Sequence, residues 1–189
     1  MVDPARDLGV MTYAAYLELE RSSATKHEYV NGRAYAMAGG TPEHARLQLR
    51  LGRALGPALD RRGCEGFSSD LRVRIVATGR STYPDLSVVC GSVERAADDP
   101  DAATNPIVIA EILSESTEAE DRGSKWLHYQ RIPSLRHYVL VSQRERRVEV
   151  YTRDGTTWRY DSVDQGGIAL SAIEATLSLD ELYRSALSD

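Results

Sequence analysis

The sequence contains little cysteine and no long apolar segment, and both absences narrow the classes of protein it can represent. Its two cysteines, Cys64 and Cys90, stand far apart in 189 residues and not at the spacing of metal ligands. They indicate neither a disulfide framework nor a zinc site, and we expect both to be buried as small apolar side chains. No run approaches the roughly 20 apolar residues of a membrane-spanning helix. Residues 1–9 include charged side chains and no apolar stretch, so they do not resemble a secretion signal. These absences predict a soluble protein of the cytoplasm.

An excess of positive charge is also missing, because the formal net charge is −5. This counts against a protein that coats nucleic acid with a broad basic surface, since such binding depends on Lys and Arg neutralising phosphates. It does not exclude a nuclease, because metal-binding carboxylates lower the net charge. One group of arginines could form a local positive face or simply a solvated helix surface: Arg46, Arg50, Arg53, Arg61 and Arg62.

The length and the 42% of hydrophobic residues suit a single domain covering residues 1–189. Capping residues and helical periodicity predict helices at 13–22, at 42–62, from 117 or 121 to 130, and at 178–187. Asn31 and Gly32, between two short runs, predict a two-residue hairpin turn. The chain therefore begins with a helix and a β-hairpin, and we expect an α/β fold.

The strands predicted after the long helix are short and separated by polar turns. Residues 70–76 alternate apolar side chains with Arg72 and Arg74, which is typical of a half-buried strand. A turn at 79–81 should precede strands at 81–90 and 106–114, and a polar surface loop is expected between these two at 94–105. A meander of three strands should follow at 137–143, 146–153 and 156–162.

One carboxylate, Glu111, stands within the apolar part of the segment IVIAEILSEST, at residues 107–117. Burying the ionised Glu111 is costly unless a cation or hydrogen-bond donors compensate it. Asp85 begins one predicted strand and Glu111 lies near the end of the next, so antiparallel pairing of these strands would bring them together. Two carboxylates in one site repel each other, whereas a divalent cation stabilises both as anions. Oxygen ligands without His or Cys favour magnesium or manganese.

A lysine working beside such a metal could stand at position 113, which shares a face with Glu111, but Leu113 occupies it. The next lysine downstream is Lys125, in a predicted helix that could pack back over its own preceding strand. An ammonium there could orient or help to deprotonate an attacking water and offset charge on a phosphate. The alternative is a surface lysine that pairs with Asp121, four residues earlier.

The residues considered so far occur together with others in a fixed order along the chain: Glu28, His44, YPD ending at Asp85, AEILSEST, DRGSK ending at Lys125, Tyr129, IPSLRHYVLVSQ and RRVEVY. This order resembles the Uma-type restriction endonuclease family of the PD-(D/E)XK nuclease superfamily, over roughly residues 11–183. The resemblance implies a restriction-endonuclease-like core, a mixed central β-sheet flanked by helices, with Asp85 and Glu111 as magnesium ligands. The superfamily pattern places lysine two residues after the second acid. Leu113 departs from that pattern, and the lysine that matches this family is Lys125.

Three other positions in this order have both functional and structural interpretations. Glu28 matches the acid before the hairpin turn and could be a further ligand or general base, or an exposed charge. His44 could contact a phosphate or a metal-bound water, or lie at a solvated helix start. Tyr129 could brace the ammonium or a substrate phosphate, or belong to the core. Hydroxyls directly before a helix are ordinarily caps and not nucleophiles, and this applies to Ser114, Ser116 and Thr117.

These features predict a magnesium- or manganese-dependent endonuclease that hydrolyses DNA phosphodiester bonds through a metal-activated water. Asp85 and Glu111 would hold the metal, Lys125 and Glu28 would complete the catalytic residues, and His44 and Tyr129 would contact the substrate. The alternative is a catalytically inactive, nuclease-like module that binds nucleic acid or protein. A homodimer or higher homo-oligomer is expected, because the C-terminal strands offer an edge for symmetric association.

Overall fold

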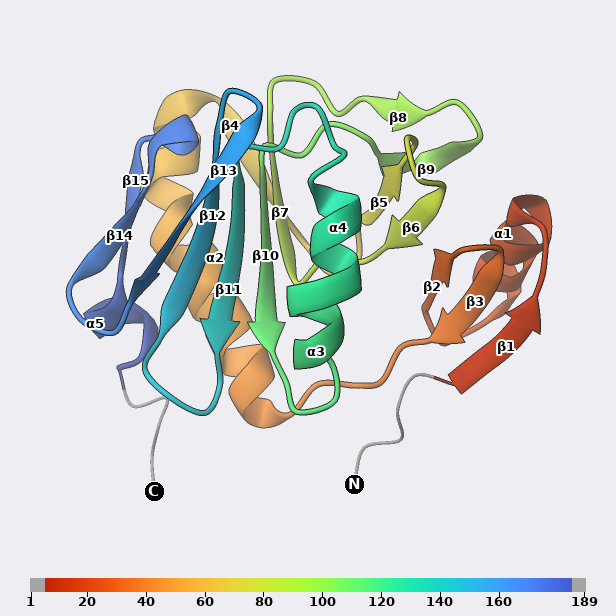
Figure 1. Ribbon diagram of the computed structural model, residues 1–189, viewed down its shortest axis with the longest axis horizontal. Helices are drawn as coiled ribbons and strands as arrows, with labels where there is room; N and C mark the ends of the chain where they lie inside the picture. The colour runs from red at the N-terminus through yellow and green to blue at the C-terminus, as the bar shows by residue number, and fades with distance from the viewer. Residues whose placement is uncertain (1–5, 185–189) are drawn as a thin grey trace.

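A computed structural model describes residues 6–184, which form two large β-sheets and a small two-stranded sheet (Figure 1). One large sheet has six strands, in the order β13 (Thr157–Val163), β12 (Val148–Asp154), β11 (His137–Ser142), β10 (Val108–Leu113), β7 (Leu86–Cys90) and β4 (Cys64–Ser68). Strands β10 and β11 are parallel, and the other neighbours are antiparallel. The predicted α/β class with a mixed sheet is confirmed.

The second large sheet has seven strands and contains the N-terminal hairpin. Its order is β1 (Arg6–Val10), β3 (Arg33–Ala36), β2 (His27–Val30), β6 (Arg80–Thr82), β5 (Arg72–Ile75), β9 (Asp99–Ala103) and β8 (Arg95–Ala96). The hairpin turn is confirmed, because Asn31 and Gly32 both have positive φ, 51° and 78°. Helix α1 (Tyr13–Ser22) begins as predicted at Thr12, whose side chain accepts a hydrogen bond from the backbone N–H of Ala15.

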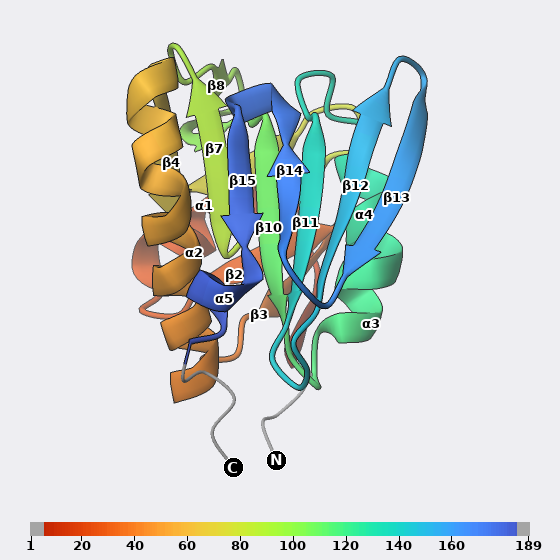
Figure 2. The same ribbon diagram turned by 90° about the vertical axis from the view of Figure 1, so that its left-hand side faces the viewer.

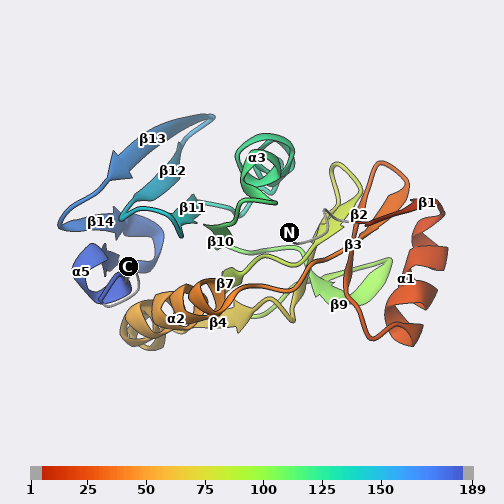
Figure 3. The same cartoon turned by 90° about the horizontal axis from the view of Figure 1, so that it is seen from below.

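Helices and the small hairpin cover both faces of the six-stranded sheet. Figures 2 and 3 show that one face carries the long helix and the C-terminal elements, and the other carries the helical segment after β10. The first face is covered by α2 (Pro42–Arg62), β14 (Gly167–Leu170), η2 (Ser171–Ile173), β15 (Ala175–Ser178) and α5 (Leu179–Leu182). The second is covered by α3 (Glu118–Glu120), η1 (Asp121–Lys125) and α4 (Trp126–Tyr129). None of the helices within 6–184 is long and apolar enough to span a membrane.

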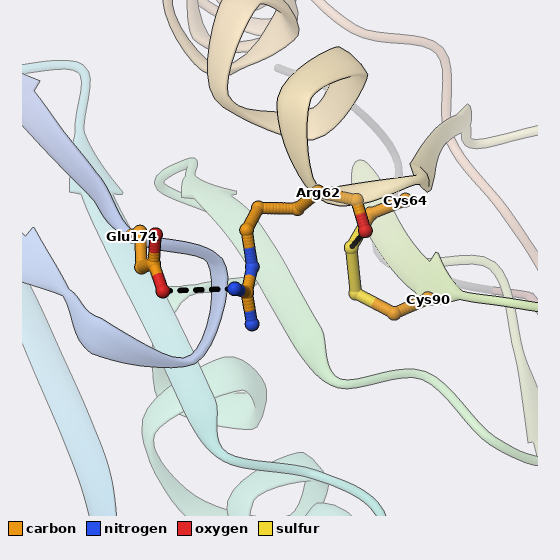
Figure 4. The surroundings of a disulfide bond; sticks show 4 residues. All are labelled: Arg62, Cys64, Cys90 and Glu174. Carbon is orange, nitrogen blue, oxygen red and sulfur yellow. Dashed lines mark hydrogen bonds and ion pairs between the residues drawn. A yellow bond between two sulfur atoms is a disulfide. The ribbon is translucent and has the colours of Figure 1, made fainter.

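The long helix α2 follows its sequence signals. Thr41 caps its start, Pro42 is its first residue, and Gly63 ends it in the left-handed region. Its leucines at four-residue spacing are buried in the core with β7 and β10: Leu47, Leu51, Leu55 and Leu59. The arginines of this helix do not form one free basic face, because Arg50 donates to the carbonyl of Leu182 and Arg62 pairs with Glu174 (Figure 4). The C-terminal helix is also capped as predicted, by Ser178, but α5 ends at Leu182, and residues 185–187 lie outside the described part.

The prediction of a half-buried strand at 70–76 was wrong on its polar face. Arg72 and Arg74 are only 7% and 8% exposed. Asp99 accepts two hydrogen bonds from Arg72, and Asp98 forms an ion pair with Arg74. Both acids come from the segment 94–105, which was predicted to be a surface loop and instead contains β8 and β9. The strand is therefore buried on both faces because two neighbouring acids neutralise its arginines.

The predicted strand 81–90 is two strands in two different sheets. Strand β6 ends at Thr82 in the seven-stranded sheet, and β7 begins at Leu86 in the six-stranded sheet. The preceding turn ends at Gly79, whose φ is 72°, so Arg80 and Ser81 belong to β6 and not to the predicted turn. The chain therefore crosses from one sheet to the other at residues 83–85.

The two cysteines form a disulfide bond, which corrects the prediction that they are separate apolar residues (Figure 4). Cys64 lies directly opposite Cys90 in the pairing of β4 with β7, and their Cα atoms are 3.9 Å apart. The sequence did not indicate this contact, because β4 was not predicted and 26 positions separate the two residues. Only the register of two strands brings them together.

Candidate functional site

Asp85 and Glu111 meet at the crossover between the two sheets. Strands β7 and β10 are antiparallel, with Leu86 opposite Ala110, so the residue before β7 lies beside the end of β10. The backbone N–H of Asp85 lies 3.3 Å from Glu111 Oε2, and the N–H of Ile112 donates to Asp85 Oδ2 at 2.7 Å. The antiparallel arrangement thus places the two acids next to each other, as the sequence predicted.

Lys125 reaches the same pocket from η1. Its Nζ lies 3.2 Å from Glu111 Oε1, 3.4 Å from Glu28 Oε1 and 2.8 Å from Asp121 Oδ1. The side chain at position 113 belongs instead to an apolar cluster on that face of β10. Lys125 does pair with Asp121 four residues earlier, but it is only 6% exposed, so the interpretation as a surface lysine is wrong.

Burial and charge shift the pKa values of Glu111 and Lys125 upward. Burial raises the pKa of Glu111 to about 8, although Lys125 opposes this, because Asp121 and Asp85 add to the negative potential. Burial lowers the pKa of Lys125, but Glu111, Glu28 and Asp121 outweigh it and hold that pKa well above its usual value. Lys125 is therefore a permanent ammonium, whereas the Glu111 carboxyl binds its proton more tightly than an ordinary glutamate unless more positive charge arrives.

Glu28 is bound to cations and is not an exposed hairpin charge. Its Oε2 accepts a hydrogen bond from Arg80 at 2.7 Å, and its Oε1 accepts one from Thr82 at 2.5 Å. Burial favours the neutral acid, but Lys125 and Arg80 dominate and lower the pKa of Glu28 to about 2. A carboxylate with so low a pKa is a weak general base at neutral pH. Its position favours a role in holding Lys125.

Asp121 and Arg80 belong to the site, although sequence reasoning did not assign them to it. Asp121 is 1% exposed, and its Oδ1 forms an ion pair with Lys125 without good hydrogen-bond geometry. Arg80 is fully buried and donates to Glu28, to Glu120 at 2.9 Å and to Ser124 at 3.2 Å. Arg80 was missed because it was assigned to a turn. The sequence carried no local signal for Arg80, whereas Asp121 stands four residues before Lys125, the spacing of a helical ion pair.

Two residues near the start of α2, His44 and Gln48, hold Asp85 in place. His44 Nε2 lies 3.1 Å from Asp85 Oδ2, and the side-chain amide of Gln48 donates to the Asp85 carbonyl at 2.7 Å. Burial opposes protonation of His44, but the hydrogen bond and charge of Asp85 prevail and raise its pKa. His44 is therefore not a solvated residue at a helix start. Its ring holds one oxygen of Asp85.

Tyr129 supports Glu111 in the same way. Its hydroxyl donates to Glu111 Oε1 at 2.7 Å, and the side chain is fully buried beside Tyr138. Tyr129 is therefore a buried partner of Glu111, which favours the alternative that it belongs to the core. Among the hydroxyls that precede the helical segment, Ser114 bonds to those of Ser116 and Thr117 and also accepts from the backbone N–H of Thr117. Thr117 directly precedes α3 but makes no side-chain capping hydrogen bond, so the prediction of a cap is wrong for it.

The carboxylates fit a hard divalent cation that keeps much of its water. Within residues 6–184, no three His, Cys, Asp or Glu side chains are grouped so as to hold a metal by themselves. Asp85 and Glu111 form a two-carboxylate set, which suits Mg²⁺ because this ion retains several waters and binds substrate phosphate. The raised pKa of Glu111 supports the fit, since it indicates negative potential that the chain itself does not fully neutralise.

Comparison with known proteins identifies relatives over most of the chain. A sequence profile of the Uma2 family, described as "Putative restriction endonuclease", matches residues 13–181. Two uncharacterized proteins of Synechocystis sp. (strain ATCC 27184 / PCC 6803 / Kazusa) are similar in sequence. Protein slr1290 is 36% identical over 173 residues, 89% of each chain, and sll1609 is 35% identical over 146 residues, 77% of this chain and 82% of the other. The structure of "a putative nuclease belonging to DUF820 from Anabaena variabilis ATCC 29413" has a TM-score of 0.77 and 20% identity, covering 94% of this chain and 99% of that one.

Proposed function

Because the chain belongs to the Uma2 family and has a restriction-endonuclease-like α/β fold, we propose that it is a magnesium-dependent endonuclease that hydrolyses DNA phosphodiester bonds. The observation that carries this proposal is the convergence of Asp85, Glu111 and Lys125, which come from a crossover, a strand and a helix. The backbone N–H of Asp85 lies 3.3 Å from Glu111 Oε2, and the Lys125 ammonium lies 3.2 Å from Glu111 Oε1. Buried acids with one ammonium suit the hydrolysis of an anionic ester.

In this mechanism Asp85 and Glu111 would hold Mg²⁺ or Mn²⁺, and the bound ion would supply Lewis-acid polarisation for the attack of water on the phosphodiester. Lys125 stays protonated, because its pKa lies well above the usual value. It therefore acts as a hydrogen-bond donor that orients the water and offsets charge that develops on the phosphate, and not as a proton acceptor. Of the roles expected for Lys125, this proposal keeps the orientation of the water and the compensation of phosphate charge, and leaves out deprotonation of the water.

The remaining residues of the site position these three groups. His44 and Gln48 hold Asp85, and Tyr129 holds Glu111. Glu28 and Asp121 hold the Lys125 ammonium by ion pairs. We therefore propose positioning roles for Tyr129, His44 and Glu28, in place of the direct contacts with substrate or proton that the sequence suggested.

The test is plasmid cleavage by the purified protein in the presence of Mg²⁺ or Mn²⁺. We expect nicking or linearisation that EDTA and Asp85→Ala abolish, and that Lys125→Met slows on the order of 100-fold or more. Lys26→Met is the matched control, because the other lysine pairs with the exposed Asp70 outside the site. Cleavage that persists both in EDTA and in Asp85→Ala would contradict the proposal.

A catalytically inactive module that binds nucleic acid or protein is the second candidate. It is favoured by Leu113 at the usual position of the lysine and by the net charge of −5. Titration calorimetry with Mg²⁺ separates the two functions, because an inactive module with an intact fold would release no heat of metal binding at Asp85 and Glu111. We also propose a homodimer that pairs through the exposed edge of β13, the outer strand of the six-stranded sheet. Sedimentation equilibrium would measure it.

A further inference from the structure

A groove with a volume of about 940 Å³ lies between helix α2 and strand β4 and ends at Asp85. One wall is the side of α2 that carries Gln48, Gly52 and Gly56, and the other wall is β4. Figure 3 shows α2 and β4 side by side along the border of the six-stranded sheet. The groove is distinct from the buried ion pairs around Lys125 and shares Asp85 and its partner Gln48 with the candidate site.

The strand that forms the second wall has a free edge. Strand β4 is the last strand of its sheet, and it pairs with β7 on one side only. No strand within residues 6–184 pairs with its outer side. A strand edge presents a row of backbone N–H and C=O groups with which another extended chain can pair. A helix lying beside such an edge forms the kind of groove in which proteins bind peptides by adding a strand.

The helix wall leaves room that the packing of this chain does not require. A methyl group added at Gly56 would meet no atom within 4 Å, and one at Gly52 would meet only Leu86 Cδ1, at 3.6 Å. Alanine would therefore fit at both positions and would favour the helix. The walls are otherwise largely apolar, with Phe67 and with Leu49, which is 76% exposed.

The charges along the groove select the chemistry of its occupant. Among the described residues, its lining contains one basic side chain, Arg53, and four acids: Asp60, Glu65, Asp70 and Asp85. Asp70 pairs with Lys26 and Asp85 contacts His44, so Asp60 and Glu65 are the acids of the described lining without such a partner in the groove. This excess of negative charge repels a nucleic-acid backbone and also repels the same groove of a second copy. It attracts an extended segment that carries Lys or Arg beside apolar side chains.

We propose that the groove between α2 and β4 binds an extended basic peptide segment of a partner protein, which pairs with β4 as an added strand. The contact would span about five residues, the length of β4. A segment that fills the groove also covers Asp85, so it would block access to the candidate active site. Binding itself is independent of the proposed nuclease activity, and only the block depends on it.

The test uses a displayed library of random peptides selected on the purified protein in EDTA. We expect the enriched peptides to carry net positive charge and to protect the amides of residues 64–68 from hydrogen exchange. Gly56→Leu should weaken their binding about tenfold or more, because the new side chain fills the groove. Ala169→Leu, at an exposed position on β14, is the matched control and should leave binding unchanged. Thermal unfolding of both variants verifies their fold.

Three results would overturn the proposal. The first is that no basic peptide is enriched, and the second is that Gly56→Leu binds the selected peptides as tightly as the wild type. The third is that a single-stranded oligonucleotide binds and loses affinity in Gly56→Leu while peptides do not, which would assign the groove to nucleic acid. Because these measurements are made without metal, an absence of nuclease activity does not affect them. Peptide inhibition of plasmid cleavage tests the block separately.

Discussion

At the scale of single residues, the site is a balance between one ammonium and several carboxylates. Glu28, Glu111 and Asp121 surround Lys125, and Asp85 lies beside Glu111. The carboxyl pKa values shift in opposite directions in the two sheets. Glu28, which also faces Arg80, has a pKa lowered to about 2, whereas the pKa of Glu111 is raised to about 8. The unneutralised charge is therefore on the Asp85 and Glu111 side of Lys125, where the metal is proposed.

Glu111 should make stability depend on pH. Its pKa rises from the ordinary 4.5 to about 8 on folding, so the folded state binds this proton more tightly than the unfolded state. Its contribution is complete below pH 4.5 and is lost as the pH rises through 8. We predict that the unfolding free energy of the wild type, relative to Glu111→Gln, falls by on the order of 5 kcal/mol over that range.

Urea unfolding at a series of pH values measures this difference. Subtracting the variant removes the contributions of other groups, such as His137, whose pKa burial lowers to about 4. A difference that stays constant with pH would show that Glu111 ionises normally in the folded protein.

Tyr129 gives a second prediction at this scale. Tyr129→Phe removes the hydrogen bond to Glu111 Oε1 and leaves a buried carboxylate less satisfied. We expect a loss of about 1–3 kcal/mol of stability and weaker Mg²⁺ binding, with the KM for DNA unchanged. A raised KM with unchanged Mg²⁺ affinity would instead indicate that Tyr129 contacts the substrate.

At the scale of elements, the site depends on contacts between segments distant in the sequence. Arg80 of β6 connects Glu28 of β2 to Glu120 and Ser124 of the helical segment. It therefore fixes the hairpin against the helix that delivers Lys125. Removing one partner of such a buried ion pair is costly, because it leaves the other charge uncompensated.

The disulfide connects β4 to β7 and closes a loop over a separation of 26 residues. Replacing both Cys64 and Cys90 by Ala should lower the unfolding free energy by about 3.5 kcal/mol, the loop-closure entropy for that length. Denaturant unfolding of the double variant, and of the wild type with and without reductant, measures it. Equal stability of the oxidised and reduced wild type would show that the bond is not a constraint in solution.

The same bond tests the predicted cytoplasmic location. Disulfides are rarely kept in a reducing cytoplasm. Thiol trapping of Cys64 and Cys90 directly from cells would show which redox state the protein has there. Free thiols would agree with a cytoplasmic location, and a disulfide would count against it.

At the scale of the whole molecule, local sequence signals were enough to predict where helices and turns begin, because the capping and turn residues lie in or next to those elements. Thr12, Thr41 and the Asn31–Gly32 turn specified element boundaries because caps and turns act within a few residues. The pairing of Asp85 with Glu111 was also predictable, since strand order and alternation constrain it.

What the sequence did not indicate depended on distant partners. The burial of Arg72 depends on Asp99, and Cys64 reaches Cys90 only through the register of β4 with β7. In the site, Arg80 is buried only because Glu28 and Glu120 converge on it. Such residues have no local signature, because tertiary contacts override their usual preference for the surface.

Metal binding should stabilise the whole molecule. If Mg²⁺ binds only the folded chain, it adds about 2.7 kcal/mol at a concentration one hundred times its Kd. We predict that Tm rises with Mg²⁺ in the wild type and not in Asp85→Asn, as differential scanning fluorimetry would measure. An equal rise in both would assign the effect to ions bound elsewhere.

The position of Lys125 among three acids also means that the chain can fold before it binds a metal ion. The chain supplies its own monovalent counter-ion to this pocket, so folding does not have to wait for an ion from solution. Small zinc domains behave in the opposite way, since they stay unfolded until the metal arrives. Here a chelator should leave a folded protein that is ready to be reloaded, and metal supply would regulate activity without regulating the amount of folded protein.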